Sequence, residues 1–210
     1  SGYKPEIETV LSEQLGTAVT IGSVRAVLNG FIPELGLYQL QILSAQNNKP
    51  ALQLKKIQIT FDVRNLIYKP WIESLKVSLI GAKLSVKRLE SGAIAISGLP
   101  SSPESEEEPL WLMQGNQYNL IDSDIQWEDK KRHTKPIQLK KVNVSINNTN
   151  GRHKVAINAI LPKEVGTSLS LMMDFTGDIF TAESIDAELF ATGKNINFNR
   201  LDSGDLPFNF

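Results

Sequence analysis

The sequence of 210 residues contains no cysteine and only two histidines, His133 and His153. The absence of cysteine excludes disulfides, zinc sites with thiolate ligands and a cysteine nucleophile. Both histidines stand in hydrophilic turn sequences, which leaves little material for an imidazole metal site or a catalytic triad. The longest uncharged stretch has 14 residues, from Leu35 to Asn48, and includes glutamine and asparagine. A membrane-spanning helix needs about 18 or more apolar residues, so no segment is expected to cross a bilayer.

Catalytic motifs are also missing. The sequence has no G-x-S-x-G motif, no glycine-rich phosphate loop and no pair of histidines at metal-ligand spacing. Its densest carboxylates within an expected strand are Asp122, Asp124, Glu128 and Asp129, and their neighbours do not supply the apolar burial that acid–base catalysis requires. We therefore expect that the protein is not an enzyme and uses neither a cofactor nor a metal.

The net charge of −1 conceals charge blocks. Residues 101–129 carry eight acidic and no basic side chains, whereas residues 130–163 carry nine basic and no acidic ones. A basic block can indicate a nucleic-acid or polyanion binder. Lysines and arginines on the solvated face of strands are the favoured interpretation, because no aromatic-rich or arginine-rich groove motif accompanies them. We expect no nucleic-acid partner.

One short helix is predicted near the N-terminus. Pro5 suits the first turn of a helix, and Gly16 suits the position after its last residue. Ile7, Val10, Leu11 and Leu15 fall on one side of this helix. A helix this short must pack against another element to be stable.

The rest of the chain is predicted to be mainly β, with antiparallel strands. Apolar and polar residues alternate with a period of two in several segments, so each strand has one apolar and one polar face. Strands buried on both sides of a parallel sheet would not alternate in this way. The segments are 75–79, 84–87, 142–147, 155–161, 168–175 and 185–191.

A repeat supports an assembly of similar units. Residues 53–61 and 138–146 align without a gap, with four identical positions and five conservative ones. In both copies the apolar alternation slips by one residue at a Lys-Lys pair, from Leu54 to Ile57 and from Leu139 to Val142, as in a β-bulge. Two hairpin-like units repeated along one chain predict an elongated β-assembly.

An acidic segment divides the two strand-rich halves. Residues 101–109 contain four glutamates, turn-forming residues and no large apolar side chain, which predicts a solvated, flexible loop. It lacks the spaced Asp, Asn and Gly ligands of a calcium loop. The expected organisation is an N-terminal strand-rich unit with its helix at 3–100, the loop at 101–109 and a second strand-rich unit at 110–210.

The order of several short segments resembles a known family. Residues 5–16, followed by Val19–Gly22, are similar to the beginning of AsmA-like envelope proteins just after their membrane anchor. The segments 30–35, 50–54 and 84–88 resemble the YhdP branch of that superfamily, as do 111–112, 121–129 and 147–153 in the second half. One position departs from the branch, which usually has tryptophan where Asn29 stands.

The resemblance implies a function that the residue pattern does not. Members of this branch are long proteins anchored in the inner membrane, and they are thought to conduct phospholipid acyl chains towards the outer membrane through a β-groove. The fold would then be a curved, one-sided β-groove, with one β-groove unit at 3–100 and a second at 110–210. The chain would be a periplasmic N-terminal module without its membrane anchor. Its helix would lie near the groove mouth, its ligand would be phospholipid, and its partners would include envelope proteins.

The groove-facing residues expected on this basis are the apolar members of the alternating strands. The same residues would also form the core of a closed β-sandwich that docks a partner protein and binds no lipid, and the sequence leaves this alternative open. The residues are Leu54, Ile57, Ile59, Phe61, Leu75, Val77, Leu79, Leu84, Val86, Val142, Val144, Ile146, Val155, Ile157, Leu169, Leu171, Met173 and Phe175.

Overall fold

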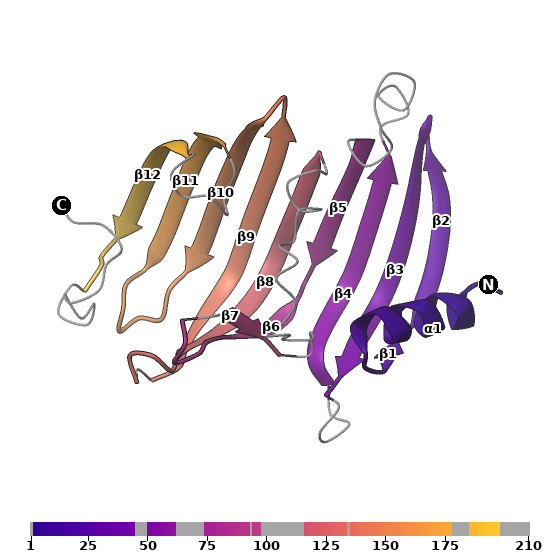
Figure 1. Ribbon diagram of the computed structural model, residues 1–210, viewed down its shortest axis with the longest axis horizontal. Coiled ribbons are helices and arrows are strands. Elements are labelled where there is room, and N and C mark those ends of the chain that lie inside the picture. Colours follow the sequence, from indigo (N-terminus) through magenta and orange to yellow (C-terminus); the bar gives the residue numbers. More distant parts are fainter. Residues whose placement is uncertain are drawn as a thin grey trace.

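A computed structural model describes residues 2–44, 50–61, 74–92, 94–97, 116–133, 135–177 and 185–197. Within these ranges the chain forms one helix and a single twelve-stranded sheet (Figure 1). The elements are α1 (Lys4–Leu15), β1 (Val19–Thr20), β2 (Ser23–Asn29), β3 (Ile32–Leu43), β4 (Pro50–Phe61), β5 (Leu75–Ile80), β6 (Lys83–Arg88), β7 (Ile94–Ile96), β8 (Gln117–Asp129), β9 (Ile137–Thr149), β10 (Arg152–Ile160), β11 (Ser168–Thr176) and β12 (Asp186–Lys194). The mainly β fold expected from the sequence is confirmed.

The sheet is mixed, whereas the sequence suggested antiparallel pairing throughout. Strands follow the order β1-β3-β4-β5-β8-β9-β10-β11-β12, with β2 beside β3 and with β6 between β4 and β8. β8 runs parallel to both β5 and β6, and all other pairs are antiparallel. This parallel junction joins the strands of the two halves into one continuous sheet. The acidic segment 101–109 lies outside the described residues.

The helix α1 ends as predicted and packs on one face of the sheet. Gly16 follows it in the left-handed conformation, with φ of 62°. The Gly16 N–H donates to the carbonyl of Glu13, and the Thr17 N–H donates to that of Ser12. Ile7, Leu11 and Leu15 contact a buried cluster that includes Leu40. Val10 was expected on the same side of the helix but is 55% exposed. The packed stripe is therefore narrower than the sequence suggested.

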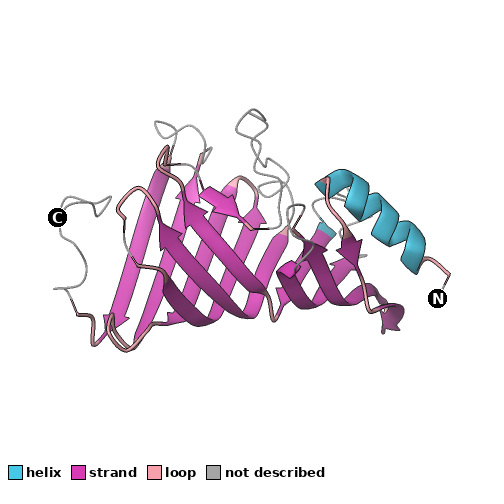
Figure 2. Ribbon diagram, turned by 90° about the horizontal axis from the view of Figure 1, so that it is seen from below, coloured by secondary structure: helices cyan, strands magenta, loops and turns pink. Residues whose placement is uncertain are grey.

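A line of backbone irregularities crosses the sheet and bends it. Gln39 in β3, Gly81 between β5 and β6, Asp122 in β8 and Lys141 in β9 all have left-handed φ values between 47° and 64°. They occupy the same height on neighbouring strands, because the pairings on either side of Lys55 in β4 place it opposite Gln39 and Gly81. We call this line the crease. Figure 2 shows the sheet curving beneath α1.

The crease explains the slip of the alternation seen in both copies of the repeat. In β9 the predicted bulge is confirmed, since Lys141 is left-handed and the pairing with β8 shifts register there. In β4 no bulge forms at the Lys-Lys pair. The alternation of β3 and of β5–β6 slips opposite Lys55, so the pairing register of β4 with both neighbours does not shift there. As a result Leu54 and Ile57, three residues apart, both face α1 and the same apolar cluster.

Candidate functional site: an apolar trough

Apolar side chains form two continuous rows across the sheet on the face that α1 covers at one end. Each row takes one residue from each of eight strands, because cross-strand partners point to the same side of a sheet. With about 4.8 Å between strands, each row extends for about 34 Å. We call the two rows and their apolar neighbours on this face the trough. The rows are Leu37, Ile57, Leu79, Leu120, Val144, Ile157, Leu171 and Ala191, and Leu35, Ile59, Val77, Tyr118, Ile146, Val155, Met173 and Leu189.

All eighteen residues expected to line a groove lie on this face. Ten of them belong to the two rows, and Phe61, Leu75, Leu169 and Phe175 continue the same alternation along β4, β5 and β11. Leu54, Leu84, Val86 and Val142 lie beyond the crease or at it, and the phase slip returns them to the same face. The structure therefore brings the whole set together, although contact between these residues and a lipid stays a prediction.

The trough also contains several residues that were not predicted from the sequence. Leu35 and Leu37 of β3 and Tyr118 and Leu120 of β8 carry the same alternation as the predicted strands. Their segments are short of β-branched residues, so the pattern there was weaker. These strands complete the trough between α1 and the C-terminal half.

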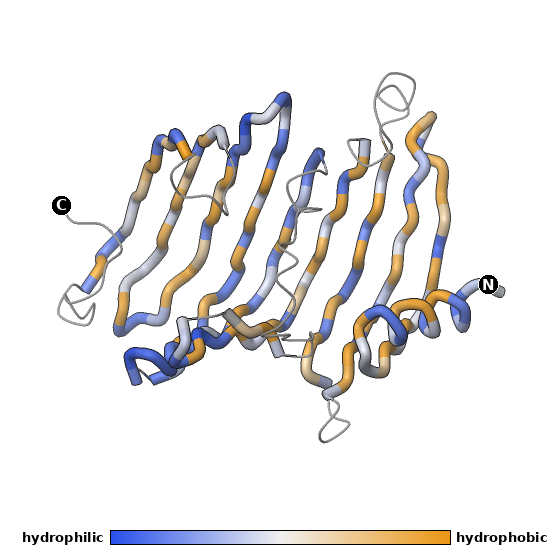
Figure 3. The backbone as a smooth tube through the Cα atoms, viewed as in Figure 1, coloured by the Kyte–Doolittle hydropathy of each residue, from blue (hydrophilic) through white to orange (hydrophobic). Residues whose placement is uncertain are grey.

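Exposure varies along the trough. Under α1 the apolar side chains are buried, and Leu54 is 5% exposed. Away from the helix Val144, Ile157, Leu171 and Met173 are only half-buried. Within the described residues no second sheet packs against this face. The hydropathy-coloured tube in Figure 3 shows orange and blue alternating along these strands, as expected for a sheet with one apolar and one polar face.

Two polar side chains, His153 and Asn148, lie at one rim of the trough. His153 was expected in a hydrophilic turn, but it lies at the start of β10 and is 8% exposed. Its ring centroid is 5.0 Å from that of Phe175, and its Nδ1 is 2.8 Å from Oδ1 of Asn148. Burial lowers the pKa of the His153 imidazole below its usual 6.5. A neutral histidine is compatible with an apolar surface.

The opposite face of the sheet is polar and cross-linked by hydrogen bonds. Asn119 Nδ2 donates to Ser78 Oγ at 3.1 Å, and Ser145 Oγ donates to Asn119 Oδ1 at 3.1 Å. Asn147 Nδ2 in turn donates to Ser145 Oγ at 3.2 Å. This chain of bonds joins β5, β8 and β9 side by side. The polar face therefore stiffens the sheet that carries the trough.

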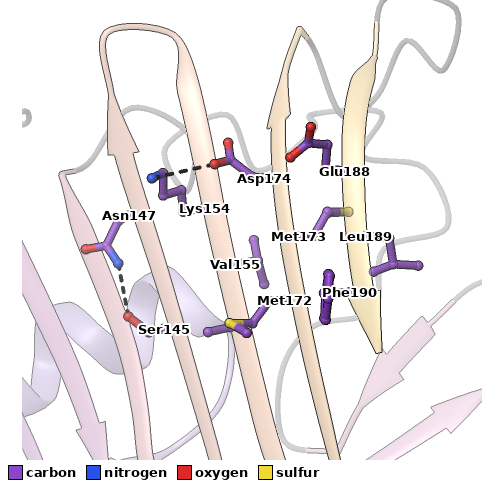
Figure 4. Close-up of a pocket in the computed structure, with 11 residues that line it drawn as sticks. Ser145, Asn147, Lys154, Val155, Met172, Met173, Asp174, Glu188, Leu189 and Phe190 are labelled. Atoms are coloured by element: carbon purple, nitrogen blue, oxygen red, sulfur yellow. Dashed lines mark hydrogen bonds and ion pairs between the residues drawn. The ribbon is translucent and has the colours of Figure 1, made fainter. Parts of the chain in front are cut away.

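A hollow of about 400 Å³ opens on the polar face near β12 (Figure 4). Met172 and Phe190 line it, and Lys154 pairs with Asp174 at 3.5 Å on its rim. A hydrogen bond from Arg152 lowers the pKa of Asp174 below its usual value. The side chains that line the hollow are those of an exposed sheet surface, and they include no nucleophile with a neighbouring base.

The carboxylates singled out in the sequence have structural contacts. Asp129 is 5% exposed, and its carboxylate bonds to Arg88 at 3.4 Å and to the backbone N–H of Arg132 at 3.1 Å. A hydrogen bond from Lys130 lowers the pKa of Glu128. Among the described residues, no group of three or more histidine and carboxylate side chains is arranged to hold a metal ion. The expectation that the protein is not an enzyme stays a prediction.

Comparison with known families agrees with the resemblance read from the sequence. The family model described as YhdP protein matches residues 1–208. Comparisons with curated proteins and with solved structures give no match. In the described part of the chain, α1 falls short of the length and hydropathy of a membrane-spanning helix. Since the family model matches nearly the whole chain, the protein belongs to the YhdP family of AsmA-like envelope proteins.

Proposed function

We propose that the trough binds phospholipid acyl chains and conducts them, as the N-terminal module of a bridge-like lipid transfer protein of the bacterial envelope. The observation that supports this proposal is the pair of unbroken apolar rows across eight strands, whose side chains in β9, β10 and β11 are half-buried. In the same proposal the module lies in the periplasm, is tethered to the inner membrane and meets other envelope proteins.

The size of the trough favours a path over a single binding site. The hydrocarbon core of a bilayer is about 30 Å thick, so the acyl chains of one leaflet extend about 15 Å. The rows extend for about 34 Å, roughly twice that length. A lipid could therefore move along the trough from strand to strand while its chains stay on apolar surface.

The energetics also suit a mobile ligand. Transfer of one methylene group from water to an apolar surface is worth about 0.8 kcal/mol, so partial cover by the trough is enough to hold a chain. The rows contain mainly aliphatic side chains, which offer contact without directional bonds. The lipid headgroup can stay in water at the open side of the trough.

The alternative is a closed module that docks a protein and binds no lipid. That interpretation needs a second sheet packed on the apolar face, and the described residues form one sheet. A partner protein could supply the cover, so the experiment must identify what contacts the trough.

Photo-crosslinking from neighbouring positions of β11 tests the proposal. Leu171 lies in the trough, whereas Ser170 pairs with Asn158 and Thr192 on the polar face. Both side chains are half-buried, so the two positions differ mainly in the face they occupy. We expect a photoreactive residue at position 171 to capture labelled phospholipid and the same residue at 170 to capture little.

Equal capture from the two positions, or capture of protein alone from 171, contradicts the proposal. Native mass spectrometry provides a second readout, in which phospholipid should co-purify with the parent chain. Leu171→Asn should reduce that occupancy strongly, because it places an amide in the middle of an apolar row. Circular dichroism establishes that the variant is folded.

A further inference from the structure

The hairpin formed by β2 and β3 has an apolar tip that projects into solvent. The exposed fractions at this tip are 50% for Val27, 68% for Leu28, 88% for Phe31 and 44% for Ile32. Figure 3 shows the tip in orange at the N-terminal edge of the sheet, away from α1. None of these side chains belongs to the buried cluster of the fold.

The turn does not require these apolar residues. Asn29 pairs with Ile32, so Gly30 and Phe31 make the two-residue turn, and Gly30 has φ of 63°. Short hairpin turns favour asparagine, aspartate and glycine because of the backbone conformation they need. A phenylalanine that is 88% exposed in such a turn contributes little to folding. Together with its exposed apolar neighbours it is typical of a site that contacts a membrane or another protein.

Both faces of the hairpin are apolar near the tip. Leu28 pairs with Pro33 on the side of the trough, whereas Val27 pairs with Glu34 on the polar side of the sheet. A protein that docked on the hairpin would cover one of these sides. A lipid bilayer surrounds an inserted tip on all sides, which matches the two-sided arrangement.

Charged side chains are distributed as a lipid surface requires. Residues 26–33 carry no charge, and the first charged residues behind them are Arg25 and Glu34. Lys56 Nζ neutralises Glu34 at 2.8 Å. Arg25 lies over the ring of Tyr38, 5.3 Å from its centroid, and makes no ion pair with a carboxylate among the described residues. Of the charges on Arg25, Glu34 and Lys56, the positive charge of Arg25 therefore remains behind the apolar tip.

The dimensions agree with insertion to the level of the upper acyl chains. Val27 lies three positions before Gly30, which corresponds to about 10 Å along an antiparallel strand. Interfacial segments commonly bury their apolar side about 5–10 Å into the boundary between headgroups and acyl chains. Arg25 follows two residues further out, where lipid phosphates can bind a guanidinium.

We propose that the tip of the β2–β3 hairpin inserts into the surface of a phospholipid bilayer and docks the N-terminal edge of the sheet there. The surface is separate from the trough and does not depend on lipid conduction. If both proposals hold, the hairpin places the open side of the trough beside a source of lipid.

Single cysteines provide a direct test, because the chain contains no cysteine. An environment-sensitive dye is attached at Phe31→Cys, or at Phe190→Cys in β12 as a control. Phe190 is 71% exposed and apolar but lies at the far edge of the sheet. With vesicles of phosphatidylethanolamine and phosphatidylglycerol, we expect a blue shift from position 31 and none from position 190. No shift at position 31, or equal shifts at both, overturns the proposal.

Paired double variants test the contribution of the side chains themselves. Leu28→Ser with Phe31→Ser should lower vesicle binding at least about tenfold, because two large apolar side chains no longer enter the bilayer. Met172→Ser with Phe190→Ser, at similarly exposed positions, should leave binding unchanged. Unchanged vesicle binding by the hairpin variant overturns the proposal. The proposal is also overturned if the parent chain forms a concentration-dependent dimer that the hairpin variant loses while it still binds vesicles. That result assigns the tip to contact with a second copy of the chain.

The two proposals fail in different ways. Crosslinking of phospholipid from position 171 reports on the trough, and the dye at position 31 reports on the hairpin. Phospholipid capture at 171 without a shift at 31 rejects the hairpin proposal alone. A shift at 31 without capture at 171 supports the hairpin proposal and counts against conduction through the trough.

Discussion

The imidazole of His153 lies against the ring of Phe175, with centroids 5.0 Å apart, at a rim of the apolar trough. Phe175 is 2% exposed and His153 is 8% exposed, so a charged imidazole there would lack solvation. The buried ring keeps its pKa below 6.5, whereas in the unfolded chain that value is restored.

The pH dependence of stability follows from this difference. Below about pH 6.5 the unfolded chain binds a proton at His153 that the folded chain does not bind, so the free energy of unfolding falls as the pH is lowered. The contribution of His153 should be constant above that pH and should decrease as the pH falls below it. Asp174 and Glu128 titrate lower still, because cationic neighbours lower their pKa values from 3.8 and 4.5.

Urea denaturation at several pH values measures the effect, with His153→Gln and His133→Gln as a pair. His133 is exposed, so its replacement should leave the pH dependence as in the parent. His153→Gln should flatten it. An unchanged slope in His153→Gln would show that another group titrates in this range.

Two leucines of the trough should differ in their contribution to stability. Leu54 is 5% exposed beneath α1, and its replacement by alanine should cost about 2–5 kcal/mol through the cavity it leaves. Leu171 is half-buried on the open part of the trough, so Leu171→Ala should cost about 1 kcal/mol, the value of its lost apolar contact alone. Denaturant midpoints at equal m-values measure both. Equal losses would indicate that the open part is covered in solution.

Helix α1 is attached to the sheet by a side chain as well as by packing. Glu8 Oε1 accepts the backbone N–H of Ile21 at 2.6 Å, at the break between β1 and β2, and Ile21 is 2% exposed. Glu8→Ala leaves that N–H without its acceptor and should cost about 1.5–3 kcal/mol. Glu8→Gln, which keeps an acceptor oxygen, should cost less. The exposed Glu13→Ala on the same helix is the control, with a change within about 0.5 kcal/mol.

Local pattern was enough to predict most of the fold. The helix, its terminal Gly16 and the strands after Leu75 follow from signals confined to a few neighbouring residues. The apolar face of each strand was also readable, since a period of two fixes which side chains point together. The family resemblance added the expectation of a groove.

What the sequence did not contain was the pairing between distant segments. The parallel contact of β8 with β5 and β6 depends on residues 40 or more positions apart, and alternation is the same in parallel and antiparallel strands that have one polar face. His153 was misplaced for a related reason. Its neighbours in sequence are polar, and only the pairing of β10 with β11 brings Phe175 beside it.

The last prediction concerns the crease, where the backbone takes a left-handed conformation that most residues avoid. Gly81 has φ of 64°, where a residue with a Cβ is strained by about 1–2 kcal/mol. A Cβ at this position would also clash with Cδ of Lys55, but that side chain is 69% exposed and can move away. We therefore expect Gly81→Ala to lower the free energy of unfolding by about 1–2 kcal/mol, mainly through the backbone.

Asparagine separates the two causes, since it adds a Cβ but tolerates the left-handed conformation. Gly81→Asn should cost clearly less than Gly81→Ala if backbone strain dominates. Repeating both substitutions in a Lys55→Ala background removes the side-chain contact and should leave that difference unchanged. If the two variants are equally destabilised, and if both recover in the Lys55→Ala background, the cost arises from crowding against Lys55 and the crease tolerates a residue other than glycine at position 81.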